Sequence, residues 1–78
     1  MNLFKLKEFN DDRVVYLYQP DGKGEWGEIA YIFSDDRATV LKRAEKNSST
    51  HERMALSKIK ERIIDKKNLP LEFIQAWY

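Results

Sequence analysis

Residue types that perform chemistry are scarce in this chain. It has 78 residues, no cysteine and one histidine, His51. A nucleophilic or acid–base site needs a titrating group beside an orienting partner, and a zinc site needs several His or Cys ligands. A lone histidine in the first turn of a predicted helix is more often incidental than catalytic. We therefore expect no enzymatic activity, no cofactor and no small-molecule substrate.

Two pairs of adjacent acids are the remaining candidates for a metal site. Asp11 with Asp12, and Asp35 with Asp36, carry oxygen ligands of the kind that Mg²⁺ prefers. Adjacent acids at the ends of strands more often serve as turn residues and helix caps. We assign both pairs to turns and caps, and we predict no metal site.

The segment GKG at residues 22–24 is similar to part of a phosphate-binding loop. Such a loop reads GxxxxGK[ST] and leads directly into a helix whose first amides face the phosphate. Here Glu25 and Trp26 follow, and a predicted strand comes next. Residues 19–27 are therefore interpreted as a hairpin loop. Trp26 near its tip either folds back onto the sheet or is presented to a partner.

A β-hairpin is the central element that must position these residues. The runs Val14 to Tyr18 and Ile29 to Phe33 are rich in β-branched and aromatic side chains, which suit strands. Pro20 and the three glycines of the chain lie between the runs and predict a chain reversal. Because neither face of the strands is polar, we predict that they are central in a larger sheet or covered on both sides.

The segments near the two ends are predicted to complete this sheet. Asn2 to Phe9 has the alternation of a strand, its lysines suit an edge position, and it would form a three-stranded meander with the hairpin. Asn68 to Tyr78 is too apolar for a free tail and forms either a final strand or a short helix that opens at Pro70. We favour an extended strand whose aromatic residues pack on the hairpin.

Two helices are predicted between the hairpin and this last segment. Polar residues 34–36 offer caps for a helix from Arg37 to Lys46, and Ser49 with Glu52 has the form of a capping box for a second helix from Thr50 to Lys67. The predicted fold is a single α+β domain with the order β-β-β-α-α-β. Its antiparallel sheet carries both helices on one face.

Charge is divided unevenly along the chain. Between Arg37 and Lys67 there are ten Lys or Arg against four Asp or Glu, whereas the other residues have four against nine. Basic residues on helices are usually solvated flanks, but they can also contact a polyanion. The candidates for nucleic-acid contact are Arg53, Lys60 and Lys67.

Surplus aromatic residues support a different function, the binding of a protein. Large apolar patches on small domains often mark partner sites. The candidate contact residues are Tyr16, Tyr18, Trp26, Tyr31, Trp77 and Tyr78. Alternatively, the C-terminal segment covers these aromatics and completes a monomeric core.

We predict a non-enzymatic interaction or adaptor module whose partner is another protein or a second copy of the chain. A nucleic-acid-binding accessory protein is the less favoured alternative. Its cations and its aromatic residues lie in different parts of the sequence, and the isoelectric point of about 7.9 is low for a dedicated binder.

The run YLYQPDGKGEWGEIAYIF, followed by a helical region and the ending AWY, resembles short proteins of Gram-positive bacteria and their mobile elements. The resemblance spans most of the chain, implies a bacterial cytoplasmic setting and carries over no functional residues. The lack of cysteine suits a reducing compartment. We find no signal-peptide core and no apolar run near the roughly 18 residues of a membrane span. We expect a cytoplasmic protein that does not enter a membrane.

Overall fold

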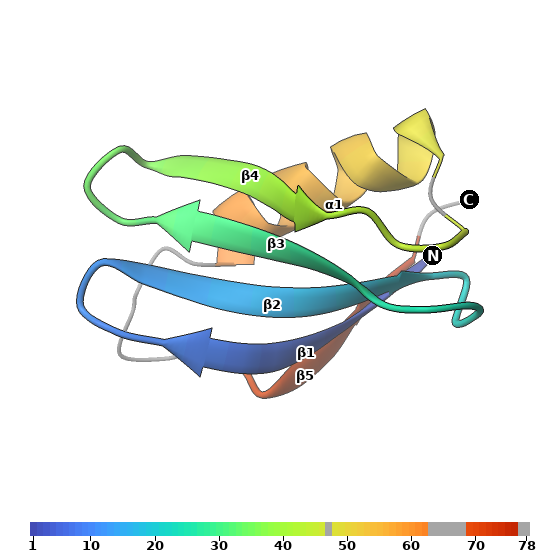
Figure 1. Cartoon of the computed structure of the whole chain (residues 1–78), viewed down its shortest axis with the longest axis horizontal. Helices are drawn as coiled ribbons and strands as arrows, with labels where there is room; N and C mark the ends of the chain where they lie inside the picture. The colour runs from blue at the N-terminus through green and yellow to red at the C-terminus, as the bar shows by residue number, and fades with distance from the viewer. Residues whose placement is uncertain (47, 63–68, 77–78) are drawn as a thin grey trace.

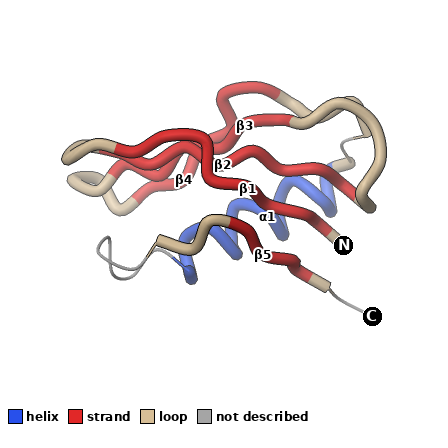
Figure 2. Tube along the Cα trace, turned by 90° about the horizontal axis from the view of Figure 1, so that it is seen from below, coloured by secondary structure: helices blue, strands red, loops and turns tan. Residues whose placement is uncertain are grey.

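One antiparallel sheet makes up most of the molecule, and a helix packs against one of its faces (Figures 1 and 2). The structure is a computed structural model that describes residues 1–46, 48–62 and 69–76. The elements in chain order are β1 (Asn2–Phe9), β2 (Arg13–Pro20), β3 (Gly27–Ile32), β4 (Arg37–Lys42), α1 (Ser49–Arg62) and β5 (Glu72–Gln75). The predicted order β-β-β-α-α-β is therefore wrong, because the described chain forms five strands and one helix.

The sheet has the strand order β4-β3-β2-β1-β5, so the first four strands are neighbours in sequence as well as in space. The two strands of the predicted hairpin, β2 and β3, are interior strands, as their apolar character on both faces indicates. The turn between them begins with Asp21 and Gly22, which both have positive φ angles, of 53° and 68°. That conformation matches the Asp-Gly pair that tight hairpin turns prefer.

The predicted helix from Arg37 to Lys46 is wrong, because its first six residues form strand β4. Thr39 and Val40 are β-branched, and exposure alternates along the strand, with Ala38 and Val40 facing the core. The preceding polar residues form a turn in which the Asp36 amide donates to the Phe33 carbonyl, at 3.4 Å. They close a hairpin between β3 and β4 and do not cap a helix.

The predicted edge position of β1 is also wrong. Its first half lies between β2 and β5, with Asn2 opposite Gln75 and Lys5 opposite Glu72. The favoured C-terminal strand is thus present as β5, and it places Phe73 over the Phe4 ring, with centroids 4.5 Å apart. The edges of the sheet are β4 and β5.

Helix α1 begins at Ser49, one residue before the predicted start, and is described as far as Arg62. The predicted end at Lys67 lies outside the described residues. Ser48 is the N-cap, because its hydroxyl oxygen accepts the His51 amide hydrogen at 3.2 Å. The helix buries Ala55 and Ile59 against the sheet face that carries Tyr16, Tyr18 and Ile29.

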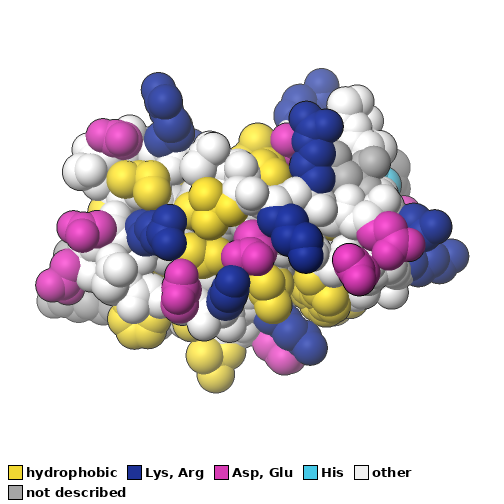
Figure 3. Space-filling model, in the orientation of Figure 1, with side chains coloured by type: hydrophobic (Ala, Val, Ile, Leu, Met, Phe, Trp, Pro, Cys, Tyr) yellow, Lys and Arg dark blue, Asp and Glu magenta, His cyan; other side chains and the backbone are white. Residues whose placement is uncertain are grey.

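The opposite face of the sheet is turned toward the viewer in Figures 1 and 3 and has no second layer among the described residues. Val15 and Ala30 lie opposite each other there and are nevertheless fully buried. Long charged side chains lie over this face, and Lys7 reaches from β1 across β2 to Glu28 of β3, at 2.7 Å. The hydrogen bond to Glu28 raises the pKa of Lys7. Apolar stems of such side chains can cover small residues while the charges stay in water.

Candidate protein-binding surface

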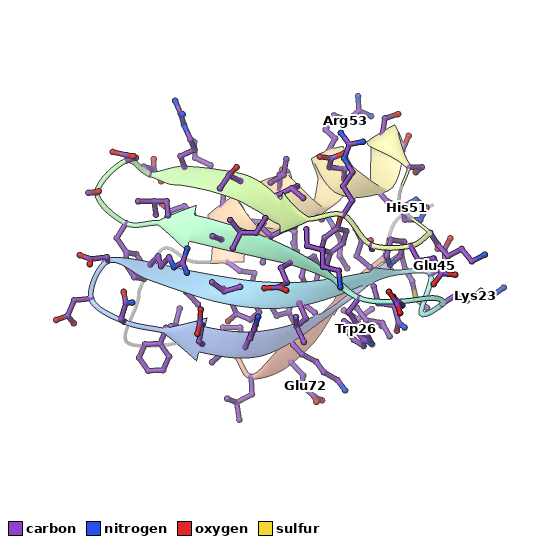
Figure 4. The ribbon with its side chains drawn as sticks, in the orientation of Figure 1. Lys23, Trp26, Glu45, His51, Arg53 and Glu72 are labelled. Carbon is purple, nitrogen blue, oxygen red and sulfur yellow. The ribbon has the colours of Figure 1, made fainter. Side chains whose placement is uncertain are left out.

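Trp26 stands beside the uncovered face of the sheet, immediately before β3 (Figure 4). Its ring is only partly buried, and the Lys5 ammonium lies 5.1 Å from the ring centroid. A cation at this distance is attracted by the negative face of an indole. The contact joins the β2–β3 loop to strand β1 and holds the indole at the sheet surface.

A groove with a volume of about 540 Å³ runs beside Trp26 between β1 and β5. We call it the Trp26 groove, and its lining residues are Leu3, Phe4, Lys5, Trp26, Glu72, Phe73 and Ile74. Leu3 and Ile74 are cross-strand partners, and the Ile74 side chain is 62% exposed. The groove therefore combines exposed apolar area, one indole, one cation and one carboxylate.

The tyrosines predicted to contact a partner lie in the core instead. Tyr16 and Tyr18 are fully buried and Tyr31 is 6% exposed. Phe73 of β5 packs edge-on against Tyr16, with centroids 5.4 Å apart. The C-terminal strand thus covers part of the aromatic face, which is the alternative that the sequence left open.

Each buried tyrosine hydroxyl has a hydrogen-bond partner. Tyr16 donates to the Pro70 carbonyl at 2.6 Å, and Tyr18 accepts the Ala44 amide hydrogen at 3.2 Å. Burial raises the pKa of Tyr16 to about 12 and also raises that of Tyr18. Tyr31 donates to the Asp36 carboxylate, and this hydrogen bond, together with burial, raises its pKa to about 12. These hydroxyls hold the fold together and are not available to a partner.

Trp26 is therefore the one predicted contact residue that the described chain leaves accessible. Trp77 and Tyr78 lie outside the described residues. Of the residues predicted to contact nucleic acid, Arg53 is exposed on α1, and the Lys60 ammonium lies 3.9 Å from the Asp36 carboxylate. Lys67 lies outside the described residues.

A hydrogen-bonded set of Ser48, His51 and Asp21 was not predicted. The Ser48 hydroxyl lies 2.6 Å from Nδ1 of His51, and Nε2 of His51 lies 3.1 Å from the Asp21 carboxylate. A serine, a base and an orienting acid in this order also occur in nucleophilic catalysis. Here the serine oxygen already caps the helix, and Asp21 also binds the Met1 ammonium at 2.8 Å.

This set is best explained as a structural tie between the β2–β3 turn and the start of α1. The hydrogen bond from the Met1 ammonium, and after it that with His51, holds the pKa of Asp21 below its ordinary value. The spacing of Ser48 and His51 is that of an N-cap, so the sequence offers a signal for this part of the set. No local pattern connects either residue to Asp21, which is 30 residues away from His51.

Two further properties of residues 1–46, 48–62 and 69–76 bear on function. No helix there combines the length and the apolar character that crossing a bilayer requires. Nor do three or more His, Cys, Asp or Glu side chains of these segments gather into a cluster that would hold a metal ion.

Comparison with known proteins adds no family to this description. No protein-family model matches the chain, and neither a curated protein nor a solved structure matches it at a significant level. Functional conclusions therefore rest on the geometry of the chain's own residues.

Proposed function

We propose that this protein is a non-enzymatic interaction module that binds another protein, or a second copy of itself, through the Trp26 groove. The observation that carries the proposal is the partly exposed indole beside Lys5, with the exposed Ile74 in the same groove. Tryptophan is among the residues that most often dominate the energy of protein interfaces.

The composition of the groove also fits a protein partner. Its apolar residues can be buried at an interface centre, while Lys5 and Glu72 can form the polar rim that interfaces typically have. Leu71, which precedes Glu72 in the chain, is also a highly exposed apolar residue, at 74%. Burial of such side chains is worth about 25 cal/mol per Å² of apolar surface.

Burial of the tyrosines weakens the nucleic-acid alternative. Proteins that bind single strands stack successive bases on exposed aromatic rings along a basic groove. Tyr16, Tyr18 and Tyr31 are buried, so they cannot form such a platform. Among the aromatic candidates that the structure describes, Trp26 alone is accessible, and Glu72 lies in its groove beside the cation.

Site-specific photocrosslinking in the cells that produce the protein tests this proposal. We would replace Trp26 with the photoreactive amino acid p-benzoylphenylalanine, irradiate the cells and identify the adducts by mass spectrometry. The matched control places the same amino acid at Phe9, which is 62% exposed and aromatic but does not line the groove.

We expect one discrete protein adduct from position 26 and none of that identity from position 9. An added Ile74→Asp change should remove the adduct, because it puts a charge into the apolar part of the groove. An adduct with a second copy of the chain identifies self-association. No adduct from position 26, or the same adducts from both positions, would contradict the proposal.

A further inference from the structure

Strand β5 forms an edge of the sheet, and part of its backbone points outward. It is the last strand beyond β1, and Figure 1 shows no described strand below it. The Leu6 amide donates to the Leu71 carbonyl at 2.8 Å, in the same register that places Lys5 opposite Glu72. Because alternate residues of a strand direct their backbone groups to opposite edges, Glu72 and Ile74 direct theirs away from β1.

The side chains along this edge are mainly apolar. Ile74 is 62% exposed, and Leu71, just before the strand, is 74% exposed. Strand β5 has the sequence EFIQ, so Glu72 is its one charged residue and it has neither lysine nor proline. Proteins commonly place lysine or proline on an edge strand to prevent pairing with another chain. The β5 edge lacks this protection.

An apolar row on the uncovered face of the sheet leads to the same edge. Leu3 lies opposite Gln19 of β2 on one side and opposite Ile74 on the other. Trp26 directly precedes Gly27, which lies opposite Tyr18, so the indole stands at the same level of the sheet. The Trp26 groove follows this row and reaches the edge of the sheet at Ile74.

A second copy of the chain can continue the sheet at β5 only in certain registers. Residues directly opposite each other in an antiparallel pair share a face. When two identical strands pair about a two-fold axis, this condition places one residue opposite its own copy. Phe73 is packed on Phe4 and Tyr16, whereas Ile74 is exposed and directs its backbone groups outward. Ile74 is therefore the residue that suits the axis.

The charges at this edge match a second copy. With Ile74 at the axis, Glu72 lies opposite the uncharged Ala76 of the other copy, so no like charges face each other. Within each copy Glu72 lies beside Lys5, and the two charges balance. The net charge of the chain is +1, which leaves little long-range repulsion between copies. An acidic or a basic segment would find no excess of counter-charge here.

Helix α1 leaves the approach to β5 open. It packs mainly on β3 and β4, at the other side of the sheet. Figure 2 views the molecule from the side on which β5 lies, and no described element stands in front of this strand. A second copy can therefore reach the backbone of β5 without displacing a described part of the fold.

We propose that two copies of the chain pair through β5 about a two-fold axis at Ile74, which joins their five-stranded sheets into one. The N–H and C=O groups of the two Ile74 residues bond to each other, and their side chains cover one another. The second copy thereby adds a wall to the Trp26 groove, and the two grooves become continuous across the axis. This dimer does not depend on the function proposed for the Trp26 groove.

Sedimentation equilibrium of the purified protein measures the association. A contact centred on a four-residue strand is small beside the roughly 1,200 Å² of total surface that stable complexes bury. We therefore expect a reversible dimer with a dissociation constant in the micromolar range or weaker. The measured mass should rise with concentration from that of the 9.3 kDa monomer to that of the dimer.

A single introduced cysteine tests the register, because the chain has none of its own. In the Ile74→Cys variant the two Cα atoms at the axis would lie about 5.5 Å apart, a separation that a disulfide can bridge. We expect a disulfide-linked dimer under mild oxidation. Leu41→Cys is the matched control, since Leu41 is 47% exposed and lies on the other edge strand, β4. It should stay largely monomeric.

A charge at the axis supplies a second, non-covalent comparison. Ile74→Asp places two carboxylates opposite each other and should raise the dissociation constant at least about tenfold. Leu41→Asp adds the same charge at the far edge and should change the dissociation constant less than about twofold. Amide spectra of both variants would verify that the fold is intact.

Three results would overturn the proposed dimer. They are a protein that stays monomeric at every concentration, equal cross-linking of the two cysteine variants, and a dimer that Ile74→Asp leaves as stable as Leu41→Asp does. The last result would mean that copies associate through another surface. Photocrosslinking from position 26 reports on the Trp26 groove separately, so either proposal can fail while the other holds.

Discussion

Tyr16 links the core to β5 and to the chain segment that precedes it. Its buried ring packs edge-on against Phe73, and its hydroxyl donates a hydrogen bond to the Pro70 carbonyl. Ionisation of this hydroxyl would place an anion among apolar side chains and remove the donated hydrogen. Burial therefore raises the pKa of Tyr16 to about 12. A buried tyrosine of this kind couples the stability of the fold to alkaline pH.

Stability should consequently fall as the pH rises from about 10 to about 12. Tyr16 in the unfolded chain ionises near its ordinary pKa of 10.0, and in the folded chain only at about 12, so the unfolded state loses its proton first. The raised pKa of Tyr16 corresponds to a loss of about 3 kcal/mol in the free energy of unfolding across this pH range. Urea unfolding at a series of pH values measures the effect, with Tyr16→Phe as the comparison. We expect the free energy of unfolding of Tyr16→Phe to fall less steeply with pH than that of the original protein. Equal slopes for the two proteins would contradict a role for Tyr16 in the loss of stability at alkaline pH.

The chemistry of single residues was only partly predictable. The alternation of side chains along a strand puts Tyr16 and Tyr18 on the same face of β2, but it does not show whether that face is covered. Phe73 of β5 covers part of that face, and it is distant from β2 in the sequence. Trp26 was predicted either to fold back or to be presented, and the described geometry combines both, because the ring meets Lys5 and still lines an open groove.

At the scale of elements, β4 shows how a turn can be mistaken for a helix cap. Acids at the start of a helix and acids in a hairpin turn give the same local sequence signal. Ala38, Leu41 and Ala44 also come close to helical spacing. Residues 37–42 form a strand because they pair with β3, where Tyr31 lies opposite Ala38 and Ala30 opposite Thr39. The short stretch of sequence around β4 does not show that pairing, because β3 is a separate segment of the chain.

Asp36 in the β3–β4 turn should be sensitive to the residue that replaces it. Its φ angle is 49°, a region that costs most residues about 1–2 kcal/mol but that Asn and Asp tolerate. Asp36→Ala also removes the acceptor of the Tyr31 hydroxyl, so we expect a loss of about 2 kcal/mol in the free energy of unfolding. Asp36→Asn keeps the acceptor and the backbone preference and should stay within about 0.5 kcal/mol of the original protein. Urea unfolding at neutral pH measures the stability of both variants. Equal stabilities would show that the side chain of residue 36 does not stabilise the β3–β4 turn.

At the scale of the whole molecule, the fold depends on a contact between its two ends. Asn2 of β1 donates to the Gln75 side chain at 3.1 Å, and Gln75 donates to the Met54 carbonyl of α1 at 2.9 Å. These bonds join the first strand, the last strand and the helix. The sequence predicted an apolar C-terminal strand, but nothing in its local pattern identifies β1 as the neighbour of that strand.

The Phe73→Ala variant tests how much the packing of β5 against β1 contributes to the stability of the fold. Phe73 stacks on Phe4 and meets Tyr16 edge-on, so truncation should cost about 3 kcal/mol in the free energy of unfolding. Ile74→Ala is the matched control on the same strand, because that side chain is 62% exposed, and it should cost less than about 0.5 kcal/mol. Thermal or urea unfolding gives both values. A Phe73→Ala loss no greater than that of Ile74→Ala would mean that β5 is dispensable for the core.

The pairing of β1 with β5 also sets the order in which the chain can fold during its synthesis. Strands β1 to β4 are joined by short turns, and each pairs with its neighbour in sequence, so their hairpins can form early. The partner of Asn2 is 73 residues away and leaves the ribosome after the other four strands. Until Phe73 arrives, the nascent sheet shows the rings of Phe4 and Tyr16 along an open strand, which is the state that chaperones recognise and from which misassembly begins.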